Sequence, residues 1–444
     1  MKQSPSGKAG AVQNSKRCSL CTNVSAPGDV SPRRSRASAW LTTVVALVLT
    51  LGGCGTGILR NPVPEALAAS AQPFGRDGLR DWGDSLDLAD VEQRVAERQA
   101  ILQAQFGAEI AAGRTPRLSY LALSGGGQWG AFGAGILDAW SRSGTRPEFQ
   151  GVAGVSTGAI IAPFAFLGPD YDATLREIYT QYSTADLLET TLFSGIVSGA
   201  ALTDTSRLRQ VIARYVTPEL LEAIAVEHRK GRILHIGTTN LDAGRPVIWD
   251  IGAIADSGEP GALELVRELI RASAAIPVAF PPIFVQVQTP DGRVFDEMHV
   301  DGGASSQVTF VSPALPIGEL TRRALGRDLD RDVYVIVNNN LVPPYQTLRP
   351  RVASIGGAAV SSLIRGSAIG DVYRLHAIAQ RDGIGFHVTA VPAAVPCPDP
   401  VEEFDRAFMQ CLFDFGASLF DSGELWSDTP PFFAARLPDP QDPS

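Results

Sequence analysis

The sequence has little positive charge, few cysteines and no hydrophobic run of comfortable membrane-spanning length. Outside residues 1–53, 31 basic and 46 acidic side chains remain, a net charge of about −15. That balance argues against nucleic acid as a partner and against electrostatic attraction to anionic membranes. Cys18 and Cys21 form a C-x-x-C pair without a second pair of ligands, so we expect no metal site and no cofactor.

The one long apolar run lies near the N-terminus. Residues 1–36 are polar and basic, residues 37–51 are apolar, and Leu-Gly-Gly then precedes Cys54. This pattern resembles a bacterial lipobox, which implies that residues 1–53 are a lipoprotein signal peptide and that Cys54 is acylated. We therefore expect a membrane-anchored lipoprotein of the bacterial cell envelope, facing the periplasm or the exterior, that depends on its lipid for attachment. A plain signal peptide or an uncleaved anchor is the alternative.

The strongest chemical signal is the pentapeptide at 154–158, which fits G-x-S-x-G around Ser156. Apolar runs on both sides predict a strand, a sharp turn and a helix. A serine in such a turn projects its hydroxyl from the backbone, and Gly154 and Gly158 leave room for the turn and for an incoming substrate. The start of the helix offers free N–H groups to a developing anion. Alone, the pentapeptide fits an ordinary structural turn equally well.

A glycine-rich stretch follows the apolar residues 120–123. Gly125, Gly127 and Gly130 fit G-x-G-x-x-G, which also occurs in dinucleotide-binding turns. That interpretation requires an acidic residue about 20 positions later at the end of a strand, whereas Glu148 precedes the next strand. The other interpretation is an oxyanion hole made of backbone N–H groups. The serine turn farther along the chain favours the oxyanion hole.

The third motif is Asp301 followed by Gly302 and Gly303. Asp-Gly-Gly is typical of a hairpin turn. It also fits a carboxylate at the end of a strand, with two glycines that let the chain turn away beneath it. The motif alone leaves both interpretations open.

In this order the three motifs resemble the patatin-like phospholipase family, here of a bacterial lipoprotein type. The resemblance implies that Ser156 is the nucleophile and that Asp301 is its only side-chain partner, in a Ser–Asp dyad without histidine. It also implies that Gly125, Gly126 and Gly127 form the oxyanion loop.

One further segment and two single positions bear on the resemblance. Residues 270–284 are similar to the family's A-S-x-A-x-P segment. Ser124 stands where the family often has aspartate, and Trp129 where it often has a basic residue. The missing positive charge weakens any expectation of anionic head groups.

The resemblance implies a three-layer α/β/α fold with a mixed, largely parallel central sheet. We expect a tether and N-terminal helix over 54–115, a catalytic domain over 116–395, and a C-terminal helix and disordered tail over 396–444. The implied activity is hydrolysis of a lipid or other acyl ester, as by a phospholipase A or esterase, through an acyl-enzyme. Residues 192–202 are apolar and glycine-bearing, which fits either core or a mobile flap.

Two other functions remain open. An α/β-hydrolase with a Ser–Asp–His triad would use Ser156, Asp301 and either His376 or His387, which occur in the required chain order. A lipoprotein that binds lipid without catalysis would also account for the fold. His299 would share the side of Asp301 on a strand and could tune its carboxyl.

Cys397 and Cys411 are close in sequence. In an oxidising compartment they could form a disulfide, which the chain-entropy model values at roughly 3 kcal/mol. The alternative is two small buried apolar side chains.

The spacing of apolar residues predicts alternating strands and helices, with a proline-bearing tether at 55–85. Helices are predicted over 86–110, 171–188, 204–229 with a break at Thr217–Pro218, 260–275, 351–381 and 401–420. Strands are predicted over 233–241, 246–250, 283–287, 294–300, 333–337 and 386–391.

Overall fold

The computed structural model describes residues 60–85, 88–190, 203–310, 317–342, 345 and 347–433. The predicted signal peptide, Cys54 and the apolar segment 192–202 lie outside these residues. Among the described helices, none combines the length and apolar character needed to cross a membrane.

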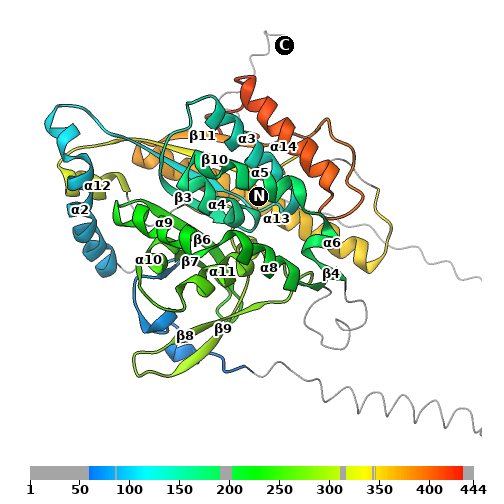
Figure 1. Ribbon diagram of the computed structural model, residues 1–444, viewed down its shortest axis with the longest axis horizontal. Coiled ribbons are helices and arrows are strands. Elements are labelled where there is room, and N and C mark those ends of the chain that lie inside the picture. The colour runs from blue at the N-terminus through cyan, green and yellow to red at the C-terminus, as the bar shows by residue number, and fades with distance from the viewer. Residues whose placement is uncertain are drawn as a thin grey trace, which may run out of the picture. The chain divides into compact units, whose positions relative to one another are not determined.

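Strands and helices alternate along most of the chain (Figure 1). The strands are β1 Arg80–Trp82, β2 Arg117–Leu123, β3 Phe149–Val155, β4 Glu189–Thr190, β5 Thr203–Asp204, β6 Ile233–Asn240, β7 Arg245–Asp250, β8 Ile283–Gln288, β9 Val294–Asp301, β10 Asp330–Asn340 and β11 Gly385–Val391. The α-helices are α2 Leu88–Ala111, α3 Gly130–Arg142, α4 Thr157–Leu167, α5 Asp172–Gln181, α6 Thr184–Leu187, α8 Ser206–Tyr215, α9 Pro218–Arg229, α10 Ile251–Asp256, α11 Ala262–Ser273, α12 Ile317–Leu325, α13 Val352–Asp382 and α14 Arg406–Asp421. Short 3₁₀ turns are η1 Glu65–Leu67, η2 Pro73–Gly75, η3 Gly127–Trp129, η4 Pro169–Tyr171 and η5 Gly302–Ala304.

The central sheet has the strand order β1-β7-β6-β3-β2-β10-β11. The five strands from β6 to β11 are parallel, while β7 and β1 add in antiparallel fashion at one edge. Strand β9 pairs antiparallel with the end of β6 and with β8. The sheet is therefore mixed and largely parallel, as the sequence predicted.

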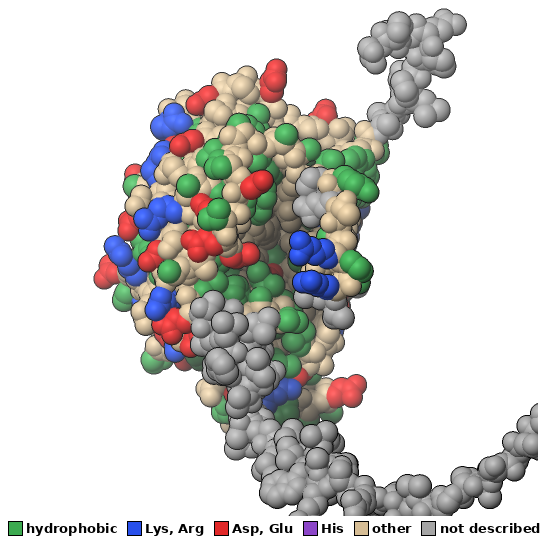
Figure 2. Space-filling model, turned by 90° about the vertical axis from the view of Figure 1, so that its right-hand side faces the viewer, with side chains coloured by type: hydrophobic (Ala, Val, Ile, Leu, Met, Phe, Trp, Pro, Cys, Tyr) green, Lys and Arg blue, Asp and Glu red, His purple; other side chains and the backbone are tan. Residues whose placement is uncertain are grey.

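Helices cover both faces of the sheet (Figure 1). Alternate residues of β2 show the division: Leu121 and Leu123 face a core shared with α3, α4, α5 and α14, whereas Tyr120 and Ala122 face a core shared with α13. Helices covering two faces of one sheet give the predicted three-layer architecture. Figure 2 shows one side of this body, where hydrophobic side chains gather in a hollow among charges of both signs.

Local polar groups explain where several predicted helices break. The side chain of Thr217 accepts a hydrogen bond from the N–H of Leu220 and starts α9, as the Thr-Pro pair predicted. Ser183 forms a capping box that separates α6 from α5, a break that the periodic pattern over 171–188 did not predict. The last helix begins at Arg406 rather than 401 because the Asp405 carboxylate caps it.

The prediction of a tether is wrong for residues 60–85. Strand β1 extends the sheet by pairing with β7, and Ala71 and Leu79 are buried. The Arg80 guanidinium forms a buried ion pair with Glu297 of β9 and donates to the carbonyl of Ala71. Proline content suggested an extended chain, but apolar burial and this ion pair fix the segment to the sheet.

Candidate active site

Ser156 occupies the turn between β3 and α4. Its backbone has φ 55° and ψ −123°, an uncommon conformation for a residue with a side chain, and the residue is only 6% exposed. Side chains at Gly154 and Gly158 would collide with the backbone of Gly158 and Leu123, respectively. The two glycines thus permit the tight strand–turn–helix geometry expected from the motif.

A second serine holds this turn in place. The N–H of Ser156 donates to the hydroxyl of Ser273 at 2.9 Å, and that hydroxyl donates to the carbonyl of Gly237 at 2.6 Å. Ser273 lies at the end of α11 and is wholly buried. It therefore links the serine turn to β6. Sequence reasoning singled out the segment around Ser273 but not this role.

Strand β6 also brings Asp301 to the serine. Val155 pairs with Gly237, and Asp301 pairs with the next residue of β6, Thr238. The end of β3 and the end of β9 therefore meet beside consecutive positions of one strand. The Asp301 carboxylate accepts a hydrogen bond from the N–H of Gly303 at 2.7 Å, and it lies near enough to the Ser156 hydroxyl for that hydroxyl to favour its charged form.

The environment of Asp301 changes its acidity. Burial raises the pKa of Asp301 to about 6, although the nearby Ser156 hydroxyl and the hydrogen bond from Gly303 act in the opposite direction. A more basic carboxylate is better suited to accept a proton from a hydroxyl near neutral pH. The Asp-Gly-Gly motif lies at the end of a strand, as one of its two interpretations predicted, because Asp301 ends β9 and η5 follows directly.

The glycine-rich loop runs from β2 into η3. Gly126 has φ 155°, and a side chain there would collide with the carbonyl of Asn338 in β10, so the loop lies against the neighbouring strand. The N–H of Gly125 donates to the carbonyl of Gln307 at 3.3 Å. Within the described part of the chain, the N–H groups of Gly126 and Gly127 have no such acceptor. Gly125 therefore serves the loop's structure, and the predicted role of this loop as an oxyanion hole stays a prediction.

The two positions that depart from the family pattern have structural partners. The N–H of Asn338 donates to the Ser124 hydroxyl at 2.7 Å, which ties the loop to β10. Trp129 packs edge-to-face on Phe408 of α14, with ring centroids 5.0 Å apart. Gly130 begins α3 where a side chain would strike Thr157.

Gln307 connects the glycine loop with the aspartate turn, a role without a signal in the sequence. Its carbonyl accepts from Gly125, and its Nε2 donates to the carbonyl of Gly303 at 2.9 Å. The buried carboxylate of Asp371 on α13 fixes this segment by accepting from the N–H groups of Gln307 and Val308, at 2.6 and 3.0 Å.

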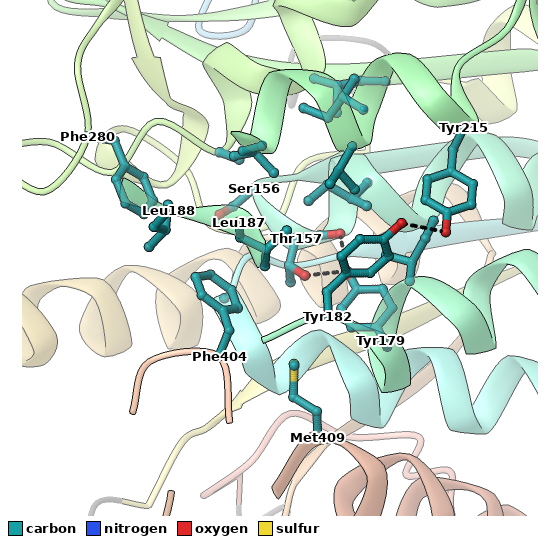
Figure 3. A pocket seen from close by; sticks show the side chains of 18 of the residues that line it. Ser156, Thr157, Tyr179, Tyr182, Leu187, Leu188, Tyr215, Phe280, Phe404 and Met409 are labelled. Carbon is teal, nitrogen blue, oxygen red and sulfur yellow. Dashed lines mark hydrogen bonds between the residues drawn. The ribbon is translucent and has the colours of Figure 1, made fainter. Parts of the chain in front are cut away.

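An apolar pocket opens beside Ser156 (Figure 3). One face of α8 contributes residues 208, 211, 212 and 215, a spacing typical of a single helix face, and α4, α5 and α11 supply the facing walls. The pocket is lined by Gly127, Ser156, Thr157, Ile160, Phe164, Ile178, Tyr179, Tyr182, Leu187, Leu188, Leu208, Val211, Ile212, Tyr215, Val216, Ile270, Ala274, Ile276, Phe280, Phe404 and Met409. Such a lining suits a hydrocarbon chain.

The C-terminal part of the chain completes this pocket. Cys397 and Cys411 form a disulfide with a Cα–Cα distance of 5.7 Å, and the loop that it closes carries Phe404 and Met409 into the lining. The N–H of Asp405 donates to Gln128 beside the glycine loop at 3.2 Å.

All five histidines lie within the described residues, and none bonds to Ser156 or Asp301 there. His387 bonds to Asp332 at 3.0 Å, and His376 packs against Phe386. His299 bonds to Glu297 and Thr238 rather than to the carboxyl it was expected to tune.

A family model matches the part of the chain that carries this geometry. Residues 121–314 match the model of the family described as Patatin-like phospholipase, a range that includes the glycine loop, Ser156 and Asp301. A search of curated proteins found no match.

Three solved structures are similar at low identity. VipD from Legionella pneumophila has TM-score 0.36 and 14% identity, covering 69% of this chain and 67% of its own. ExoU from Pseudomonas aeruginosa, solved with SpcU, has TM-score 0.28 and 14% identity, covering 71% and 54%. Human GIVD cytosolic phospholipase A2 has TM-score 0.29 and 10% identity, covering 78% and 65%. At these TM-scores none of the three carries weight for function.

Proposed function

We propose that the protein is a serine acyl hydrolase that cleaves the carboxylic esters of lipids, as a phospholipase A or esterase does. The observation that carries the proposal is the position of the Ser156 hydroxyl next to the buried Asp301 carboxylate, beside an apolar pocket that Ser156 lines. The family match over 121–314 supports the same activity class.

The proposed reaction has two halves. Ser156 Oγ attacks the ester carbonyl carbon while its proton passes to Asp301, and the N–H groups of Gly126, Gly127 and Thr157 stabilise the oxyanion. Thr157 is the first residue of α4, so its N–H has no acceptor within the helix. The tetrahedral species expels the alcohol, which takes the proton from Asp301, and leaves an acyl-enzyme. Water then gives a proton to Asp301 and attacks the acyl carbon, and Ser156 leaves with that proton.

Single substitutions test the dyad against the triad. Ser156→Ala and Asp301→Asn should each lower ester hydrolysis by roughly 10²–10⁴-fold or more, because each removes a group that the reaction requires. His376→Ala and His387→Ala are the matched controls and should keep most of the activity. Each variant is checked for folding by circular dichroism. A folded histidine variant as inactive as Ser156→Ala would establish the triad instead.

Covalent labelling separates catalysis from simple lipid binding. A fluorophosphonate probe should modify Ser156 in the wild-type protein but not in Ser156→Ala. Absence of both labelling and ester hydrolysis in the folded wild type would favour the non-catalytic lipoprotein.

We also propose that Cys54 is acylated and anchors the protein to a membrane of the bacterial envelope. The basic leader, the apolar run and the Leu-Gly-Gly-Cys end support this proposal. Mass spectrometry of the membrane fraction should find a lipidated N-terminal Cys54. An unmodified Cys54 inside an intact leader would contradict it.

A further inference from the structure

Two tyrosines form a distinct part of the pocket lining. Tyr182 follows the last residue of α5, and Tyr215 ends α8. Their hydroxyls are 2.9 Å apart, and their rings meet edge-to-face with centroids 6.2 Å apart. In Figure 3 they lie on one side of Thr157, while Phe280 and Leu188 lie on the other side, beyond Ser156.

The hydroxyls of this pair are held from outside the pocket. Tyr215 donates to Glu177 at 2.7 Å, and Arg214 donates to the Tyr182 hydroxyl at 3.4 Å. Arg214 and Glu177 also form an ion pair of 3.2 Å, and their side chains are 66% and 42% exposed. The polar ends of the tyrosines therefore meet solvent-facing charges, and their rings separate these charges from the apolar lining.

Other parts of the lining are backed differently. Ile212, Ile270 and Phe164 are buried members of the main hydrophobic core. Truncation of one of these side chains would enlarge the pocket inward, toward that buried core. Truncation of a tyrosine in the pair would instead open the pocket toward the surface that carries Glu177 and Arg214.

We propose that Tyr182 and Tyr215 form the barrier that limits the length of the acyl chain the pocket accepts. The inference rests on the proposed acyl hydrolase function and names the residues that set its substrate range. An acyl chain long enough to reach the pair meets two rings whose hydroxyls are hydrogen-bonded to each other and to Glu177 and Arg214. The hydroxyls are occupied by these partners, so the barrier presents aromatic surface to the end of the chain.

The test is a ladder of p-nitrophenyl esters from acetate to palmitate. Tyr182→Ala and Tyr215→Ala should raise the ratio of kcat/KM for palmitate over butyrate by on the order of tenfold, because each additional buried methylene is worth about fourfold in binding. Tyr215→Phe keeps the ring and should retain the wild-type ratio. Tyr373→Ala is the matched control, since Tyr373 is also half-buried but donates to Pro431 and does not line the pocket.

The outcomes distinguish this inference from the proposed function. Unchanged ratios in active, folded Tyr182→Ala and Tyr215→Ala would overturn the barrier and leave the hydrolase intact. If the wild type hydrolyses no ester, the barrier is tested by binding. Fatty acids from butyrate to palmitate then displace a fluorescent fatty acid from Ser156→Ala and from Ser156→Ala/Tyr215→Ala. A selective gain for the longer acids in the double variant supports the barrier, and equal displacement by both proteins overturns it.

Discussion

The buried carboxyl of Asp301 should make the protein less stable as pH rises, and Asp301→Asn should remove that loss. In the folded protein the pKa of Asp301 is about 6, above its ordinary value of 3.8. Between these two values the folded state binds more protons than the unfolded state. Stability from the protonated form is therefore fully present below about pH 4 and is lost as pH rises through 6.

The size of the effect follows from the shift. About two pKa units at 1.36 kcal/mol each correspond to a loss of about 3 kcal/mol above pH 6. Asn carries no charge at any pH. The stability of Asp301→Asn relative to wild type should therefore increase by about 2–3 kcal/mol between about pH 4 and about pH 8, whatever constant offset the amide introduces.

Thermal unfolding of both proteins across this pH range measures the difference. Ser156→Ala is the control, because it is expected to be inactive like Asp301→Asn but keeps the ionisable carboxyl and should keep the pH dependence. A pH-independent difference between wild type and Asp301→Asn would refute the reasoning. The wild-type kcat/KM should also rise with pH through about 6, since only the carboxylate can accept the serine proton.

Three further substitutions address the groups around the dyad. Ser273→Ala leaves the N–H of Ser156 and the carbonyl of Gly237 without their partner, so it should cost roughly 1–3 kcal/mol of stability by denaturant unfolding and about 10²-fold in kcat by misplacing the serine. Asp371→Asn turns an acceptor of several hydrogen bonds into a group that also donates, and should lower the thermal midpoint by several degrees. Cys411→Ser frees the loop that carries Phe404, so it should lower the free energy of unfolding by about 3 kcal/mol. It should also raise KM more than it lowers kcat, and an unchanged KM would contradict the loop's role in binding.

The sequence was most informative where the chemistry is local. The residues around Ser156 and those after Asp301 contain their own turn signals, since glycines and a short strand determine the backbone there. The alternation of apolar runs similarly predicted α/β layers, whereas the largely parallel sheet was implied by the family resemblance. These features depend on neighbours within a few positions.

The supports of the site were not predictable in the same way. Gln307 meets Gly125 across 182 positions, and Asp371 meets Gln307 across 64. Ser273 resembles any small residue near a helix end until β6 is seen beside it. Arg80 likewise gave no sign of its ion pair with Glu297, because the surrounding prolines suggested an extended tether. Such contacts depend on the order of strands in the sheet, which local periodicity does not specify.

The residues proposed to carry out the chemistry lie in one region of the chain, and some of those that shape the pocket lie outside it. Ser156, Asp301 and the glycine loop all lie within residues 121–314, the region shared with the family model. Phe404 and Met409 line the pocket from outside that region, on a loop closed by the Cys397–Cys411 disulfide. Under the proposed function, a change in this loop can alter which acyl chain fits without moving the strand ends that align Ser156 and Asp301, because those ends are fixed by β6 and α11. Substrate preference can therefore change through this loop while the geometry of the proposed dyad is retained.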